Sequence, residues 1–139
     1  MSGYLLDTNV LAELRKRNRC HPGVAAWFEA IDDTEIFTSV LVAGEIRRGI
    51  ELAKRKDPRK ALVLENWLKG LLAQFHDRVL SVDSLVVEQW GKLCVEQRLP
   101  DGDGLIAATA LTHSLTLVTR NTEDFVRSGV PLFNPFHAS

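Results

Sequence analysis

The chain has 139 residues, of which 45% are hydrophobic and 25% are charged, as is usual for a soluble globular protein. This length predicts one domain over residues 1–139 with a sizeable core. The formal net charge of −1 excludes attraction of a polyanion by overall charge, so a nucleic-acid surface has to be a local patch. No apolar run approaches the ~20 residues of a membrane span, and nothing resembles a signal peptide. The two cysteines lack metal-ligand spacing, so we expect free thiols and a cytoplasmic location.

Short apolar strands alternate with helices along the chain. In order, the pattern predicts a strand at Tyr4–Leu6, a helix from about Asn9 to the charged run Arg15–Arg19, a helix from Pro22 to Ile31, a strand at Ile36–Thr38, helices over Val40–Lys54 and Pro58–Phe75, a strand at Val79–Val82, helices over Leu85–Arg98 and Asp103–Thr112, and strands at Leu115–Val118 and Pro131–Phe133. Ser39 is a suitable N-cap for the third helix. This alternation predicts an α/β fold in which helices flank a short, mostly parallel central sheet.

Four acidic side chains are predicted to gather at one edge of this sheet. Asp7 directly follows the first strand, Glu45 lies in the helix after the second strand, and Asp103 opens the last helix. Asp124 follows the fourth strand, three residues after Asn121. In an open parallel sheet the functional crevice lies beyond the carboxyl ends of the strands. These four carboxylates are therefore candidate catalytic residues.

Each acid also has a purely structural interpretation. Asp7 and Asp103 suit helix N-termini, where a carboxylate accepts hydrogen bonds from free amides. Glu45 has nearby arginines for a surface ion pair, and Asp124 suits a solvated turn. The sequence leaves these interpretations open for each residue taken singly.

A cluster of the four acids needs compensation. Two carboxylates ~4 Å apart repel by about 4 kcal/mol at an effective dielectric constant near 20, which is large beside a typical domain stability of ~5–15 kcal/mol. Such carboxylates have to be protonated or share a cation, and hard oxygen ligands select magnesium or manganese. No Lys or Arg adjoins Asp7 or Asp103 in sequence. We therefore predict these two as metal ligands.

Four stretches give the chain a family resemblance: LLDTNVLAEL (5–14), VLVAGEIRRGI (40–50), DGLIAATALTHSLTLVTRN (103–121) and LFNPF (132–136). Together they resemble PIN-domain proteins, and among these the VapC toxins of bacterial toxin–antitoxin pairs, especially the FitB-like branch. The resemblance implies a magnesium-dependent endoribonuclease (manganese substituting), a homodimer, and a DNA-binding VapB-type antitoxin partner. Asp7, Glu45 and Asp103 match the first three acidic positions of the family. At the fourth, this chain has Asn121, and Asp124 is the candidate replacement.

Other polar residues are candidates for binding RNA or for holding the carboxylates. Thr8, Asn9, Thr119 and Asn121 lie beside the acids in sequence, although turn chemistry explains each of them equally well. Arg47 and Arg48 begin a basic stretch that could contact the RNA backbone. The alternative function is a catalytically weak PIN-fold protein that acts only in complex with a DNA-binding antitoxin, and the asparagine at position 121 favours it.

Overall fold

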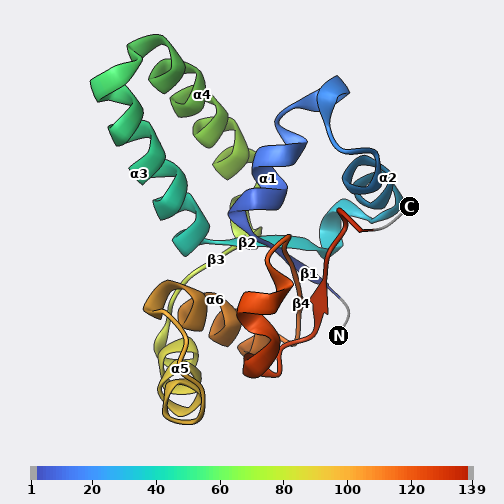
Figure 1. Cartoon of the computed structure of the whole chain (residues 1–139), viewed down its shortest axis with the longest axis vertical. Coiled ribbons are helices and arrows are strands. Elements are labelled where there is room, and N and C mark those ends of the chain that lie inside the picture. Colours follow the sequence, from blue (N-terminus) through green and yellow to red (C-terminus); the bar gives the residue numbers. More distant parts are fainter. Residues whose placement is uncertain (1–2, 138–139) are drawn as a thin grey trace.

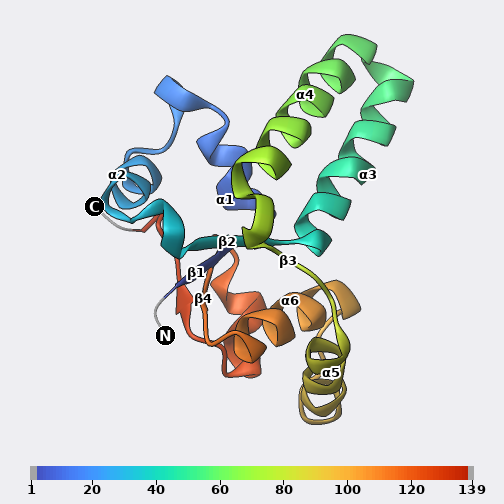
Figure 2. The same ribbon diagram turned by 180° about the vertical axis from the view of Figure 1, so that it is seen from behind.

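Five short strands form one parallel sheet with helices on both faces (Figure 1 and Figure 2). The computed structural model describes residues 3–137. The strands are β1 (Tyr4–Leu6), β2 (Ile36–Ser39), β3 (Val79–Leu80), β4 (Thr116–Val118) and β5 (Leu132–Phe133), and the helices are α1 (Thr8–Leu14), α2 (Pro22–Ala30), α3 (Val40–Lys56), α4 (Pro58–Phe75), α5 (Ser84–Glu96) and α6 (Asp101–Thr112). The described residues also include four 3-10 segments: η1 (Arg17–Arg19), η2 (Asp33–Glu35), η3 (His76–Arg78) and η4 (Thr122–Ser128). The α/β prediction is confirmed.

The strand order β3-β2-β1-β4-β5 places a switch in chain direction at β1. The chain moves outward through β2 and β3 on one side of β1 and then crosses to β4 and β5 on the other side. At such a switch the connections leave β1 and its neighbour in opposite directions, which opens a crevice beyond their carboxyl ends. Asp7 and Thr119 follow the two central strands at this point.

The strand β1 shows how the two layers of the core are separated. Leu5 and Leu6 are both fully buried, but they belong to different hydrophobic clusters. Leu6 packs with α1, α2, α3 and α4, whereas Leu5 packs with α5, α6 and Phe125 of η4. Successive side chains of a strand point to opposite faces, and burying each leucine contributes roughly 1.5–3 kcal/mol. Figures 1 and 2 show the two groups of helices on opposite sides of the sheet.

Local signals set most helix boundaries. Ser39 caps α3 through a 3.0 Å hydrogen bond from the Leu41 N–H to its hydroxyl, as predicted. Pro58 occupies the first turn of α4 behind its N-cap Asp57, also as predicted. Within residues 3–137, no helix is both long enough and apolar enough to cross a membrane.

Several boundaries differ from the prediction by one or two residues. The strand β3 ends at Leu80 instead of Val82, since its partner β2 turns into α3 after Ser39. The helix α5 ends at Glu96 instead of Arg98, with extended backbone at the next residue. The helix α6 begins two residues earlier than predicted, and its first turn is closed by a 2.8 Å bond from the Gly104 N–H to the Pro100 carbonyl.

Candidate functional site

Asp7 lies at the carboxyl end of β1 and is the N-cap of α1. Its Oδ1 accepts a hydrogen bond from the Thr8 backbone N–H at 2.9 Å, so the capping role considered above is real. Its Oδ2 accepts one from the Thr119 hydroxyl at 2.9 Å, and the Asn9 side-chain amide lies 3.4 Å from the same oxygen. Because Asp7 is only 7% exposed, these donors fix the direction in which its carboxylate faces.

Thr119 connects the end of β4 to the start of α1. The residue is fully buried, and besides donating to Asp7 its hydroxyl accepts hydrogen bonds from the Asn9 side chain at 3.2 Å and the Asn121 backbone N–H at 3.1 Å. The Asn9 carbonyl oxygen in turn accepts from the Arg120 backbone N–H at 2.9 Å. The residues predicted to assist the carboxylates at this point thus form one network beneath Asp7.

Glu45 reaches the same edge from α3. Its Oε2 accepts a 2.9 Å hydrogen bond from the Thr8 hydroxyl, the residue directly after Asp7. Partial burial of the Glu45 carboxyl raises its pKa, and the negative charges of Asp7 and Asp103 raise it further, against the Thr8 hydrogen bond and nearby Arg48. Glu45 therefore lies within electrostatic range of both predicted metal ligands.

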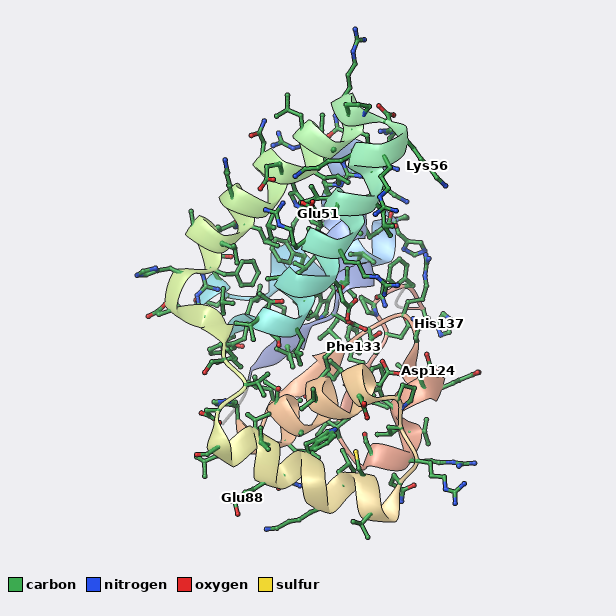
Figure 3. The ribbon with its side chains drawn as sticks, turned by 90° about the vertical axis from the view of Figure 1, so that its left-hand side faces the viewer. Glu51, Lys56, Glu88, Asp124, Phe133 and His137 are labelled. Atoms are coloured by element: carbon green, nitrogen blue, oxygen red, sulfur yellow. The ribbon has the colours of Figure 1, made fainter. Side chains whose placement is uncertain are left out.

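Asp103 occupies the first turn of α6. Burial raises its pKa above the usual value, and the charges of Asp124 and Asp7 add to the shift. Asp124 is exposed in η4, and in Figure 3 it is seen between the α3–α4 hairpin and the α5–α6 pair. The fold thus brings all four predicted acids, Asp7, Glu45, Asp103 and Asp124, into one cluster.

Asn121 and Asp124 are linked through the backbone and not through their side chains. Both belong to the 3-10 turn that starts η4, and the Asp124 backbone N–H donates to the Asn121 carbonyl at 3.1 Å. Among residues 3–137, however, the Asn121 side chain forms no hydrogen bond with Asp124. Asn121 is exposed, and its backbone N–H is held by Thr119.

The four clustered acids stand apart from the ion pairs of the described residues. Among the described residues, ion pairs join Lys16 to Glu13, Arg47 to Glu51 and Glu65, and Lys54 to Glu51, and none of them includes the four clustered acids. Burial and then the neighbouring negative charges raise the pKa values of Glu45 and Asp103, so ionisation of these two acids costs free energy.

The donor set fits a hydrated hard cation. Within residues 3–137, no three Asp, Glu, His or Cys side chains stand close enough to enclose a metal ion by themselves. Mg²⁺ commonly keeps several waters and is held through one or two carboxylates, so it does not require such a cage. Asp7 and Asp103 carry carboxylate oxygens of the kind that such a cation prefers, at a site whose repulsion a cation would relieve.

The two predicted RNA-binding arginines have different environments. Arg47 donates to the Glu65 carboxylate of α4, at 2.7 Å for one pair of atoms, and also to Glu51. Arg48 instead lines a cavity of about 460 Å³ together with Glu45 and Gly102. The structure therefore brings Arg48, and not Arg47, to the acidic cluster.

Sequence reasoning missed two further arginines at the site. A second cavity, of about 400 Å³, is lined by Asp103 and Asp124 and also by Arg98 and Arg127. The sequence predicts Arg98 as the last residue of a helix, and no motif singles out Arg127. Only the path of the chain around α6 brings them together.

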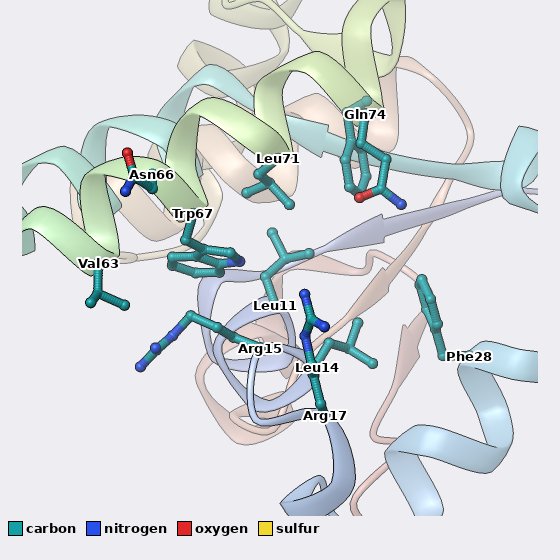
Figure 4. Close-up of a pocket in the computed structure, with 11 residues that line it drawn as sticks. Leu11, Leu14, Arg15, Arg17, Phe28, Val63, Asn66, Trp67, Leu71 and Gln74 are labelled. Atoms are coloured by element: carbon teal, nitrogen blue, oxygen red, sulfur yellow. The ribbon is translucent and has the colours of Figure 1, made fainter.

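A separate groove lies between α1, α2 and α4, with a volume of about 550 Å³ (Figure 4). Apolar side chains such as Leu14 and Trp67 form its walls, and Arg15 and Arg17 also line it. The Arg15 guanidinium lies 5.5 Å from the centre of the Trp67 ring, within cation–π range.

Comparison with known proteins agrees with this geometry. The PIN domain family matches residues 4–129. Toxin FitB of Neisseria gonorrhoeae is 32% identical over 138 residues, covering 96% of this chain and 98% of that protein. VapC ribonuclease Y4jK of Sinorhizobium fredii is 30% identical over 138 residues, covering 95% and 96% respectively.

The solved structure titled FitAB bound to IR36 DNA fragment matches this fold with a TM-score of 0.87. Its sequence identity is 31%, and the match covers 98% of this chain and 97% of that one. Sequence and fold therefore agree over almost the whole chain, including the strands and helices that carry the four acids. The chain belongs to the PIN-domain family.

Proposed function

We propose that this protein is a magnesium-dependent endoribonuclease and the toxin of a type II toxin–antitoxin pair. The observation that carries the proposal is the cluster of four carboxylates at the switch point of the sheet, none of which forms an ion pair among the described residues. The names of two relatives, a toxin and a VapC ribonuclease, point the same way.

In this proposal Asp7 and Asp103 hold the metal ion, directly or through water. When bound, Mg²⁺ lowers the pKa of water and offsets charge that develops on the scissile phosphate. Thr119 keeps the Asp7 carboxylate facing the cluster through its 2.9 Å hydrogen bond. The role of Thr119 is positioning, because its hydroxyl is buried behind Asp7.

Glu45 is the proposed general base. Its carboxylate orients the attacking water and accepts the proton that the water loses. The raised pKa of Glu45 suits this task, because proton transfer is most efficient when the pKa of the base lies closer to the operating pH. The Thr8 hydroxyl fixes its Oε2 at 2.9 Å. In-line attack breaks the bond to the 3′ oxygen, which leaves 5′-phosphate and 3′-hydroxyl ends without use of the RNA 2′-hydroxyl.

The experiment that tests the function is cleavage of a generic single-stranded RNA by the purified protein in Mn²⁺. We expect cleavage that stops with EDTA, products with 5′-phosphate ends, and no cleavage by Asp7→Asn protein. Asparagine also caps helices well, so this variant keeps the start of α1. Cleavage by Asp7→Asn at the wild-type rate would show that the active site lies elsewhere.

A specific observation favours the alternative, a catalytically weak PIN-fold binding protein. At the fourth acidic position this chain offers Asn121, and a neutral carbonyl is a weaker partner than a carboxylate for a hard cation. We propose that Asp124 supplies the missing charge. Asp124→Asn should then reduce both Mn²⁺ affinity and cleavage, and adding Asn121→Asp should restore much of the loss. An inactive wild-type protein that still forms a DNA-binding complex would support the alternative.

We also propose a homodimer that binds an antitoxin encoded beside it. The groove lined by Leu14 and Trp67, with Arg15 and Arg17, suits an amphipathic segment that carries acidic side chains. A Lys or Arg of that partner would offset the acidic cluster as a metal does. Co-expression with the neighbouring gene should give a complex with little ribonuclease activity, and a fully active complex would contradict this role.

A further inference from the structure

Arg98 and Arg127 flank the acidic cluster without belonging to it. They line a cavity of about 400 Å³ with Asp103, Glu123 and Asp124. Both are exposed, one in the loop before α6 and the other in η4. Among the side chains that the structure describes, neither arginine forms an ion pair or a hydrogen bond. Two guanidinium groups beside three carboxylates thus keep their donors available.

The charge of this cavity depends on whether a cation is present. Without one, three carboxylates outweigh the two guanidinium groups, and a phosphate would be repelled. A divalent cation held by Asp7 and Asp103 would add two positive charges at the edge of this cavity, beside its three carboxylates and two guanidinium groups. The cavity then becomes net positive. Its wall also includes Pro100, at the amino end of α6, where the helix dipole is positive.

We infer that Arg98 and Arg127 bind an RNA phosphate next to the scissile one, on the flank of the acidic cluster opposite Arg48. The inference rests on the proposed function. Arg48 shares its cavity with Glu45 and Gly102, while Asp103, the next residue along α6, lines the cavity of Arg98 and Arg127. The RNA backbone would run from one cavity to the other across the first turn of α6, with the scissile phosphate at the carboxylates.

Guanidinium groups suit this task better than ammonium groups. The planar fork of arginine can donate two parallel hydrogen bonds to a phosphate, which gives geometry as well as charge. An adjacent phosphate that is fixed in this way positions the scissile one without taking part in bond breaking. The two arginines are therefore substrate-binding residues, and their loss should affect KM far more than kcat.

The test uses Arg98→Gln, Arg127→Gln and the double variant, with Arg19→Gln as the matched control. Arg19 is an exposed arginine in η1 and lines neither of the two cavities at the acidic cluster. Cleavage of a short fluorescent single-stranded RNA in Mn²⁺ gives kcat and KM. We expect KM to rise about tenfold for each single variant, since a charge-assisted hydrogen bond contributes that much to affinity. We expect kcat, and the Arg19→Gln protein, to stay near wild type.

Two further measurements separate binding from metal loading. Each lost phosphate contact should reduce the slope of log affinity against log salt by about 0.7. The rise in melting temperature caused by Mn²⁺ should be unchanged in Arg98→Gln and Arg127→Gln. Arg127→Lys, which keeps the charge but loses the fork, should fall between wild type and Arg127→Gln.

RNA binding itself is measured by fluorescence anisotropy, with and without Mn²⁺, in the Glu45→Gln background, which lacks the proposed general base and keeps both proposed metal ligands. This readout keeps the inference separate from the proposed function. If wild-type protein fails to cleave RNA, the proposed function is wrong. Anisotropy of the arginine variants still decides whether Arg98 and Arg127 bind RNA. A wild-type KM in the double variant would overturn the inference. A loss of Mn²⁺ affinity in the arginine variants would also overturn it, because it would assign the arginines to the metal site. A loss of antitoxin binding with unchanged RNA affinity would overturn it as well, because the arginines would then contact the antitoxin instead of RNA.

Discussion

Thr119→Val replaces the hydroxyl that holds Asp7 by a methyl group of nearly the same volume. Thr119 is fully buried and donates a 2.9 Å hydrogen bond to the Asp7 carboxylate. A hydrogen bond to a charged group contributes about 1.5–3 kcal/mol. The Asn9 side-chain amide and the backbone amide of exposed Asn121 also lose this acceptor. Water can replace the bond to Asn121, and the Asn9 amide keeps its contact with Asp7. We therefore expect the free energy of unfolding to fall by about 2–3 kcal/mol.

This loss translates into a measurable shift of the melting temperature. With a typical unfolding entropy of about 2.1 cal/mol/K per residue, a chain of this length loses roughly 7–10 °C for 2–3 kcal/mol. Calorimetry or circular dichroism of metal-free protein at neutral pH measures it. Mn²⁺ affinity and cleavage should fall as well, because the Asp7 carboxylate is no longer held towards the cluster.

Thr119→Ser is the matched control, because it keeps the hydroxyl and removes only a methyl group. Its stability should fall by about 1 kcal/mol or less through the lost apolar contact, and Mn²⁺ affinity should stay near wild type. A neutral surface substitution shifts the melting temperature by roughly 1–2 °C. If Thr119→Val unfolds within that range of wild type and binds Mn²⁺ equally well, the hydrogen bond to Asp7 does not organise the site.

Three other substitutions probe the cluster and its support. Asp103→Asn should make metal-free protein more stable than wild type at neutral pH, and urea denaturation should show this difference shrinking towards pH 4. The raised pKa of Asp103 means that the folded state binds the proton more tightly than the unfolded state does. The wild-type protein therefore loses stability as the pH rises and Asp103 ionises. Asp124→Asn should weaken Mn²⁺ binding without lowering the melting temperature of metal-free protein, since Asp124 is exposed; an unchanged Mn²⁺ titration would make it a surface residue. Gly104→Ala should cost about 1–3 kcal/mol, because the new methyl would lie 3.1 Å from Trp90, whereas Gly102→Ala meets nothing within 4 Å and should be neutral or better.

Local chemistry in the sequence predicts most of the fold. The cap Ser39, the proline at position 58 and the apolar run Tyr4–Leu6 each act over a few residues, and each is found in its predicted role. The edge strand β3 was predicted too long because its end depends on where its partner β2 turns away. That information lies in another part of the chain.

The candidate site divides in the same way. Asp7, Glu45 and Asp103 lie on or beside regular elements, so the topology of a parallel sheet was enough to predict that they gather. The choice between Arg47 and Arg48 was not predictable, because it depends on Glu65 from a different helix. Arg98 and Arg127 lie in irregular segments whose paths no periodicity reveals.

The measurement that tests the central claim most directly is a Mn²⁺ titration of thermal stability in wild type and in Asp7→Asn, Asp103→Asn protein. A ligand that binds only the folded state stabilises it by about 2.7 kcal/mol at a hundredfold excess over Kd, which for this chain corresponds to about 9 °C. We predict this rise in wild type and none in the double variant. An equal rise in both proteins would show that the metal binds elsewhere and would contradict the account.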